Sequence, residues 1–279
     1  MKAALLVLRA ELERLARSRA AWALLVVVAA LSAARAAATI ALAGRAGATL
    51  DAGGAWAPFV DGWSLGLALT AAITLVAGAL ILASDLENGV VRLTLTRSAG
   101  RGSLLVGRCL LAPFVALPLA CAAGFGAWAS ARLGAGGSLD FGALVEEGYQ
   151  YMSAAEVWRE VELACASSAL GLLGLWALGL AVATLARSAA WAVALALGGW
   201  LAFDQLKRDL LGDDAYWFFP SHVPSPEDAS AFAGLAAFVR GASDALPADE
   251  HMTYALLAPA LGVPLVLLGA WTSLARRRL

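Results

Sequence analysis

Residues 61–83 read DGWSLGLALTAAITLVAGALILA, and residues 84–102 read SDLENGVVRLTLTRSAGRG. About 20 mostly apolar residues are needed to cross the hydrocarbon core of a bilayer as a helix, and the first stretch satisfies this requirement. The second stretch carries two acids, three arginines and three glycines. This pairing predicts a membrane-spanning helix that ends at a polar surface, where the charged segment lies.

The whole chain follows the same pattern as this opening stretch. Its 279 residues are 61% hydrophobic and 15% charged, whereas soluble domains are about 45–50% apolar and about 25% charged. One globular core cannot bury this excess, so lipid must be part of the solvent. The sequence predicts an all-α polytopic membrane protein, a single domain over residues 1–279, with six spans at about 20–43, 61–83, 104–131, 163–186, 189–206 and 254–275.

Three local features qualify these spans. Pro113 and Pro118 predict a kink in the third span, because proline removes a helical hydrogen bond. Asp204 and Lys207 interrupt the far end of the fifth and shortest span. Gly62-x-x-x-Gly66 is a spacing that permits close contact between helices.

The segment before the first span, residues 2–18, predicts a separate interfacial helix. Leucines recur along it at helical spacing, and charged residues occupy another face at steps of four. The leucines are Leu5, Leu8, Leu12 and Leu15, and the charged residues are Arg9, Glu13 and Arg17. The alternative is that these residues extend the first span, but charges recur too often for hydrocarbon.

The distribution of charge predicts the orientation. With six spans both termini share one side, which would carry 13 of the 20 cations and four of the 21 acids. The cations are Lys2, Arg9, Arg14, Arg17, Arg19, Arg92, Arg97, Arg101, Arg108, Arg187 and Arg276 to Arg278. Cytoplasmic loops are rich in Lys and Arg, so the termini and residues 84–102 are expected in the cytoplasm and the loops 132–162 and 207–253 outside. The preference for arginine and alanine indicates a GC-rich bacterial genome, and hence the bacterial inner membrane.

The outer segments contain two helix-start signals. Ser153 and Glu156 form a capping-box pattern at the start of the fourth helix. Ser225-Pro-Glu-Asp228 predicts a second start, whose helix would lay Phe232, Leu235, Phe238 and Val239 along the outer membrane surface. Arg35, within the first span, is expected either to reach the outer headgroups or to pair with an acid such as Asp61.

No catalytic residue, bound cofactor, metal site or nucleic-acid-binding face is predicted in this chain. His222 and His251, its only histidines, fall in the predicted outer loop 207–253, which leaves none for a dyad inside the membrane. Neither Lys2 nor Lys207 follows the glycine pattern of a phosphate-binding loop. Any ATP hydrolysis would therefore take place in another polypeptide.

The stretch 84–102 and the layout of the spans resemble the membrane subunit of ABC-2-type transporters. That family has an acidic, glycine-bearing segment after the second span, a leucine-rich run, and an arginine and Gly-Arg opening the third span. The matching residues here are Asp85, Glu87, Gly89, Leu93, Thr94, Leu95, Thr96, Arg101, Gly107 and Arg108.

Within the family, the chain is most similar to the NosY-like permeases of nitrous-oxide reductase maturation. The similarity lies in Thr96-Arg-Ser-Ala-Gly-Arg-Gly102, in Pro224-Ser-Pro-Glu-Asp228 and in the end Arg-Arg-Arg-Leu279. The chain departs from that type at Ser98, where the type has proline, and at Val90, where it has glycine.

The resemblance implies a short cytoplasmic coupling helix that docks on a separate ATPase subunit, which holds ATP and Mg²⁺, and a homodimer of this chain. The implied coupling residues are Asp85, Glu87, Gly89, Arg92, Leu93, Leu95, Thr96, Arg97 and Arg101. The alternative is an ordinary positively charged cytoplasmic loop, which accounts for the arginines but not for Asp85 and Glu87.

Three functions follow from these observations. The first is an ABC permease subunit that converts ATPase movement into transport. The second is a NosY-like subunit that passes this movement to an extracytoplasmic protein involved in copper-enzyme maturation, gripped by outer acids. The acids are Glu146, Glu147, Glu156, Glu160, Asp213, Asp214, Glu227 and Asp228. The third is a channel or anchor that works without an ATPase.

Overall fold

The described part of the chain is helical apart from one short β-hairpin. The computed structural model describes residues 2–45, 54–89, 100–133, 140–146, 149–225, 230–241 and 249–276. In chain order the elements are α1 (Lys2–Arg17), α2 (Arg19–Arg45), α3 (Trp56–Glu87), α5 (Arg101–Cys109), α6 (Ala112–Leu133), β1 (Leu144–Glu146), β2 (Tyr149–Met152), α7 (Ala154–Leu185), α8 (Ala189–Leu211), the 3₁₀ helices η1 (Gly212–Trp217) and η2 (Phe219–His222), α9 (Ala231–Val239) and α10 (Asp249–Arg276).

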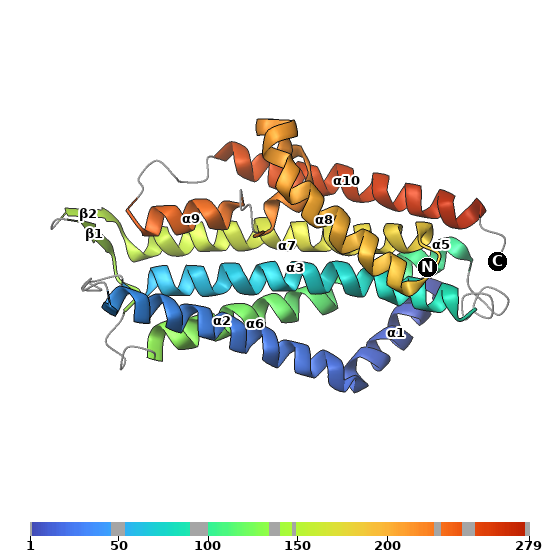
Figure 1. Cartoon of the computed structure of the whole chain (residues 1–279), viewed down its shortest axis with the longest axis horizontal. Helices are drawn as coiled ribbons and strands as arrows, with labels where there is room; N and C mark the ends of the chain where they lie inside the picture. Colours follow the sequence, from blue (N-terminus) through green and yellow to red (C-terminus); the bar gives the residue numbers. More distant parts are fainter. Residues whose placement is uncertain are drawn as a thin grey trace.

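Six of these helical segments are long and apolar enough to cross a membrane, which confirms the predicted polytopic fold. They are Arg19–Arg45, Trp56–Glu87, Arg101–Leu133, Ala154–Leu185, Ala189–Lys207 and Met252–Arg276. Figure 1 shows most of them side by side along the long axis, with both chain ends at one end of the bundle and the β-hairpin at the other. These two ends are called the termini end and the hairpin end below.

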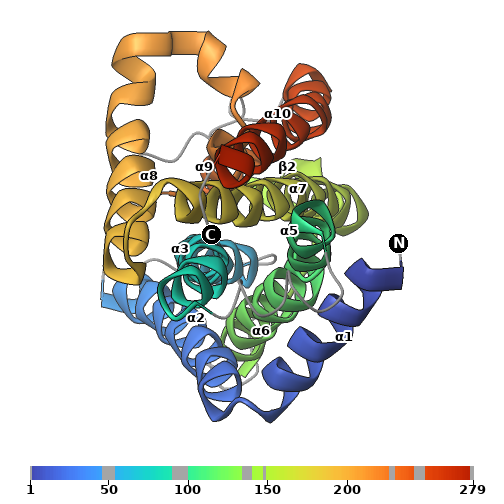
Figure 2. The ribbon, with the colours of Figure 1, turned by 90° about the vertical axis from the view of Figure 1, so that its right-hand side faces the viewer.

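The central helices of the bundle are α3 and α7. Viewed along the long axis, α2 and α6 flank them on one side, and α8 and α10 lie on the other (Figure 2). The apolar windows of α3 and α7 are 50% and 61% buried, against 17–22% for α2, α8 and α10. The leucine, valine and tryptophan side chains exposed on these outer helices therefore face lipid, as in other membrane bundles.

Glycines allow the central helices to touch. A Cβ at Gly78 of α3 would lie 2.7 Å from the backbone oxygen of Trp176 in α7, and a Cβ at Gly179 would overlap the backbone of Leu75. The Gly62-x-x-x-Gly66 spacing also marks a contact, because a Cβ at Gly62 would lie 2.7 Å from the backbone oxygen of Ser32 in α2. Small residues let membrane helices approach closely and gain van der Waals contact.

The third span is broken where proline was expected to act. Helix α5 ends at Cys109 and α6 begins at Ala112, and the backbone N–H of Leu111 bonds to the oxygen of Arg108 at 3.2 Å. Pro113 has no N–H and occupies the first turn of α6, where none is needed. Pro118 lies inside α6 without ending it.

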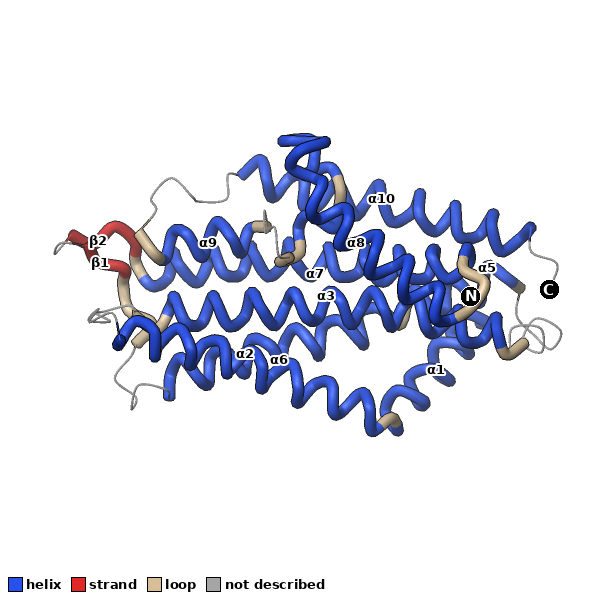
Figure 3. The backbone as a smooth tube through the Cα atoms, in the orientation of Figure 1, coloured by secondary structure: helices blue, strands red, loops and turns tan. Residues whose placement is uncertain are grey.

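The predicted N-terminal helix is a separate element. Helix α1 ends at Arg17, and the Ser18 hydroxyl accepts a hydrogen bond of 3.3 Å from the N–H of Ala21 in α2. Figure 3 shows α1 meeting α2 at an angle across this point. The alternative of an extended first span is therefore wrong, because a capped second helix starts there.

The predicted outer loop 207–253 is corrected by the structure. Helix α8 continues to Leu211 and crosses the bundle at a steep angle (Figure 2), and the chain then returns inward through η1, η2 and residues 223–225. The Ser168 hydroxyl, near the middle of α7, donates a hydrogen bond of 3.3 Å to the backbone oxygen of His222. His222 is 3% exposed, so it lies at mid-length in the bundle and not in a solvated loop.

This return segment, residues 212–225, satisfies the two charges of the fifth span. Lys207 Nζ donates to Asp204 Oδ1 at 2.6 Å and to the Ser225 hydroxyl at 3.2 Å, and the Ser225 hydroxyl donates to Asp204 Oδ1 at 2.5 Å. Asp204 and Lys207 are each 1% exposed. Buried charges persist when they are paired and hydrogen-bonded, so α8 keeps both residues inside the protein.

The helix expected from Ser225 is also corrected. Ser225 bonds to Asp204 and Lys207, and the N-cap of α9 is Ser230, whose side chain makes no capping bond. Phe232, Leu235 and Phe238 are buried, and α9 packs against α3 and α7. These apolar side chains therefore join the core of the bundle and do not lie on the membrane surface.

The hairpin end is held together by aromatic packing. Strands β1 and β2 are antiparallel, and Phe141, just before β1, lies 4.8 Å from Trp56 of α3 and 5.8 Å from Trp158 of α7 between ring centroids. The predicted capping box at the start of α7 is confirmed, with both Ser153 and Glu156 taking part. The hairpin is thus fixed to the ends of both central helices.

Candidate functional site

The described flanks of the charged segment between α3 and α5 lie at the termini end, where they bond to other helices. Asp85, Glu87 and Gly89 close α3, and Arg101 opens α5. The other residues implied by the family resemblance, Arg92, Leu93, Leu95, Thr96 and Arg97, lie outside the described residues. The site is therefore built from the two flanks of the segment.

Arg108 of α5 is the centre of this site. Its guanidinium is 3% exposed and pairs with Asp85 of α3 and, at 3.4 Å, with Oε1 of Glu11 in α1. Two formal negative charges thus face one positive charge. The Nε and Nη1 atoms of Arg108 have no hydrogen-bond partner among the described residues. A buried ion pair of this kind is costly to break, because a single charge is left without its partner.

The break between α5 and α6 links the same residue to α7. In an unbroken helix the backbone oxygen of Arg108 would accept from Ala112 four residues later. Here it accepts a hydrogen bond of 2.9 Å from the indole N–H of Trp176, which is 1% exposed. Arg108 therefore joins four elements, α1, α3, α5 and α7.

Glu87 joins α3 to α8. Its Oε2 accepts a hydrogen bond of 2.9 Å from the backbone N–H of Ala189, at the first turn of α8. The Ser188 hydroxyl accepts from the N–H of Trp191 at 3.3 Å in the same turn. A carboxylate and a hydroxyl at this position satisfy orphan N–H groups and complement the helix dipole.

Gly89 and Arg101 complete the flanks of the segment. Gly89 has a φ of +70° just after the end of α3, a backbone conformation that glycine adopts without strain. On the other flank, Arg101 Nη1 donates a hydrogen bond of 2.6 Å to the backbone oxygen of Ala275, in the last turn of α10. A cation at a helix C-terminus complements the helix dipole.

Glu11 and Arg108 were not predicted as site residues from the sequence, although Glu11 stands out in it. Glu11 falls three residues after Leu8 and four before Leu15, so a carboxylate borders the leucine stripe of α1. A Cβ at Gly107 would lie 2.7 Å from the backbone oxygen of Ala4. This close approach of α5 to α1 brings Arg108 within reach of Glu11.

The acids expected to hold an outer partner do not form one described cluster. Glu156 is engaged in the capping box with Ser153, and Glu160 follows one turn later on α7. Asp214 is exposed on η1, which packs against α8 and α10 away from the hairpin. Glu146 and Asp213 are placed by their backbone alone, in β1 and η1, and Glu147, Glu227 and Asp228 lie outside the described residues.

A second ionic cluster lies near the hairpin end. Asp61 of α3 is 9% exposed and accepts a hydrogen bond of 3.1 Å from the Thr39 hydroxyl of α2. Arg240, just after α9, also donates to this carboxylate, and Arg35 lies 3.9 Å from it. Of the two alternatives for Arg35, the pairing with Asp61 is therefore found, and its side chain is still 47% exposed.

The two clusters differ in composition. The cluster at Arg108 combines two carboxylates with one guanidinium, and the cluster at Asp61 combines one carboxylate with two guanidinium groups and a hydroxyl. Over the described ranges, no three histidine, cysteine, aspartate or glutamate side chains gather closely enough to hold a metal ion. The arrangement is suited to joining helices at one membrane surface.

Comparison with known proteins adds no family to this description. No family model matches the chain, and no match is found among the curated proteins.

Proposed function

We propose that this chain is the permease subunit of an ABC transporter in a bacterial inner membrane, with the termini end in the cytoplasm. One observation carries the proposal: the two flanks of the segment between α3 and α5 bond to α8 and α10, and Arg108 of α5 links them to α1 and α7. A loop that only connects two spans does not need bonds to further helices. A segment that transmits force from a motor to the spans needs such bonds.

The proposed mechanism is mechanical. An ATPase subunit binds ATP and Mg²⁺, closes on a second copy and displaces the segment between α3 and α5. Glu87 passes the movement to α8, and Asp85 passes it to Arg108, which contacts α1 and α7. The break between α5 and α6 lets α5 follow the segment while α6 stays packed on α2 and α3. Two copies of this chain would line the path between them.

Cysteine crosslinking in native membranes tests the contact with an ATPase. Gly100 precedes α5 in an ordinary extended conformation, and a Cβ there meets nothing within 4 Å. With Cys109, Cys121 and Cys165 replaced by alanine, Gly100→Cys is expected to crosslink to a nucleotide-binding protein. The yield should change on addition of ATP and Mg²⁺.

Gly44→Cys is the matched control. Gly44 lies in the last turn of α2, at the hairpin end of the bundle, and a Cβ there would also meet nothing within 4 Å. This variant should capture no nucleotide-binding protein. If Gly100→Cys captures none either, in membranes where the ATPase genes are expressed, the ABC assignment is wrong and the channel or anchor alternative is favoured.

A second candidate function is supported by the hairpin end. Trp56, Phe59, Phe141 and Trp158 pack edge to face with centroids 4.8–6.3 Å apart, so the hairpin forms one body with α3 and α7. Such a platform suits a chain that passes movement to an extracytoplasmic protein. Val145 is 41% exposed on β1, and a photocrosslinker in its place should capture such a protein. Capture of lipid alone would leave this candidate without support.

A further inference from the structure

A cavity lies under the bend between α1 and α2. In the part of the chain that the structure describes, it has a volume of about 570 Å³ and is lined by residues of α1, α2, α3 and α6, together with Trp176 of α7. Cavities of about 300–1,000 Å³ are typical of small-molecule sites. Two of its lining residues, Glu11 and Trp176, also contact Arg108, so the cavity borders the links proposed to transmit movement.

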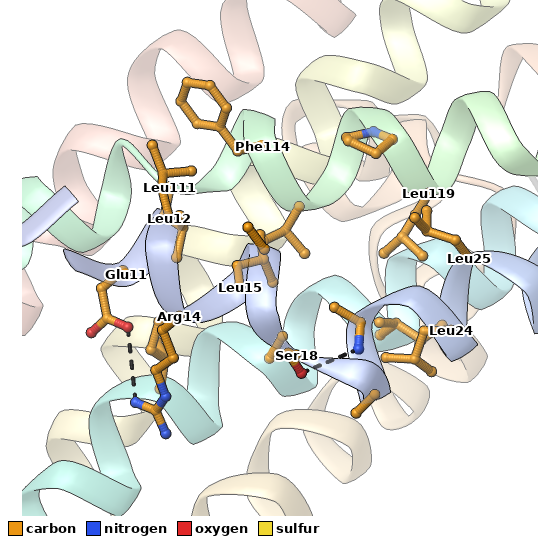
Figure 4. Close-up of a pocket in the computed structure, with 18 of the residues that line it drawn as sticks. Glu11, Leu12, Arg14, Leu15, Ser18, Leu24, Leu25, Leu111, Phe114 and Leu119 are labelled. Carbon is orange, nitrogen blue, oxygen red and sulfur yellow. Dashed lines mark hydrogen bonds and ion pairs between the residues drawn. The ribbon is translucent and has the colours of Figure 1, made fainter. Parts of the chain in front are cut away.

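The lining of the cavity changes from polar to apolar along its length. Glu11 and Arg14 of α1 lie at one end, and Leu24 and Leu25 of α2 lie at the other with Leu119 of α6 (Figure 4). Most of the remaining lining is leucine, isoleucine, alanine and phenylalanine. A ligand that fits this gradient has one polar end and a long apolar part.

The gradient runs in the direction expected for a membrane lipid. Helix α1 is amphipathic and precedes the first span, so the end with Glu11 and Arg14 lies at headgroup level. Leu24 and Leu25 are in the second turn of α2, inside the hydrocarbon. Trp22, which also lines the cavity, donates its indole N–H to the backbone oxygen of Ala16 at 3.0 Å and is 61% exposed, as is typical of tryptophan at a membrane interface.

The polar end of the cavity carries one carboxylate, Glu11, and one exposed guanidinium, Arg14. Glu11 is drawn to the buried Arg108, so its contact with Arg14 is loose at 3.9 Å, and the Arg14 side chain is 69% exposed. Arg9 pairs with Glu13 at 3.1 Å on another face of α1. Arg14 is thus the cation beside the cavity that can meet a phosphate, and cations near a membrane surface attract anionic lipids.

We propose that this cavity binds an anionic phospholipid from the leaflet at the termini end. Its phosphate contacts Arg14, and one acyl chain fills the space between α2, α3 and α6. Water would not fill an apolar cavity at this depth, and an empty one would cost its lining the lost contacts. Because this inference depends on the membrane fold alone, it does not require the ABC assignment.

Native mass spectrometry of the full chain tests the proposal. Detergent-solubilised protein is incubated with equal amounts of phosphatidylglycerol and phosphatidylcholine, and the lipid that stays bound is counted. The wild-type chain should retain one phosphatidylglycerol. Ala77→Phe places a ring in the cavity and should abolish this binding, whereas Arg14→Gln should lower the preference for phosphatidylglycerol by about fivefold, the effect of one cation at the surface.

Two variants control for the substitutions. Ala194→Phe adds the same ring to an exposed position of α8, and Arg45→Gln removes a cation at the hairpin end of α2. Both should bind lipid as the wild type does. Equal retention by the wild type and Ala77→Phe would mean an annular lipid only, and equal retention of the two lipids by the wild type would overturn the anionic preference.

A second measurement on the wild-type chain does not depend on a variant folding. Phosphatidylglycerol with a diazirine on its acyl chain is photolysed with the protein in nanodiscs, and the labelled peptides are identified. Labelling is expected in residues 20–25 and 111–119, at the walls of the cavity. Labelling spread evenly over the exposed faces of α8 and α10 would contradict a defined site.

Discussion

At the scale of single residues, Arg108 connects α5 to three other helices at the termini end. It is buried among α1, α3 and α7 and meets Glu11, Asp85 and the indole of Trp176. Arg108→Gln removes a buried cation from two partly buried carboxylates, Glu11 and Asp85, and should destabilise the protein by about 3–5 kcal/mol. Thermal unfolding in detergent, followed by circular dichroism, measures the change.

Arg9→Gln is the comparison for this variant, because the Arg9–Glu13 pair is solvent-exposed at 79% and 55%. Exposed pairs contribute little to stability, so this variant should unfold with the wild type. Equal unfolding temperatures for Arg9→Gln and Arg108→Gln would show that the buried pairs do not hold the helices together.

Lys207 and Asp204 provide a second prediction at the residue scale. Lys207→Met leaves the buried Asp204 carboxylate without this cation, and should cost about 3–5 kcal/mol. Asp204→Leu combined with Lys207→Met removes both charges and should recover most of this loss, since an apolar pair avoids desolvation. Unfolding of the single and double variants measures the recovery; a double variant as unstable as the single one would mean that the pair acts through shape and not charge.

At the scale of elements, the contact between α3 and α7 depends on glycine. Gly179→Ala would place a methyl group against the backbone of Leu75, and overpacking of this kind costs about 1–3 kcal/mol. Gly198→Ala on α8 meets nothing within 4 Å and should be neutral or stabilising, because alanine favours helices. Thermal unfolding of the two variants distinguishes them; a Gly179→Ala protein as stable as Gly198→Ala would show that the two helices can separate without cost.

The elements that the sequence predicted well are those with local signals. The six spans, α1 and the capping box of α7 depend on composition and on residues close in sequence. Helix α9 was misplaced, because Ser225 had a cap-like sequence but its hydroxyl bonds to Asp204 and Lys207 of α8. The site between α3 and α5 was predicted only in part. Asp85 and Glu87 are recognisable in the sequence as acids next to an apolar span, whereas their partners Arg108 and Ala189 are far from them along the chain.

At the scale of the whole molecule, the feature that the sequence did not predict is the return of the chain after α8. Asp204 and Lys207 seemed to end a span near the outer surface, but the return segment brings Ser225 to them and buries all three. Polar residues inside a bilayer have to find partners in the protein. Ser225, the partner of Asp204 and Lys207, lies in a segment that folds back into the bundle. Hydropathy alone does not predict where such a segment lies.

The orientation is a prediction at this same scale. On a chain without native cysteines, Gly44→Cys should react with a membrane-impermeant maleimide added to spheroplasts, and Gly100→Cys should react only after permeabilisation. The reason is that the termini end carries most of the arginines, which favour the cytoplasm. The reverse pattern of labelling would place the termini outside and remove the basis for a cytoplasmic motor.

In the described part of the chain, helix α7 is one of two unbroken helices that join the two ends of the bundle, the other being α3 (Figure 1). It has 32 residues and no proline, a length of about 48 Å at 1.5 Å per residue, and it carries Trp158 against the hairpin and Trp176 against Arg108. A push along this helix at one membrane surface would therefore arrive at the other without passing through any joint. The function proposed above, in which movement at one end of the bundle is used at the other, requires a connection of this kind.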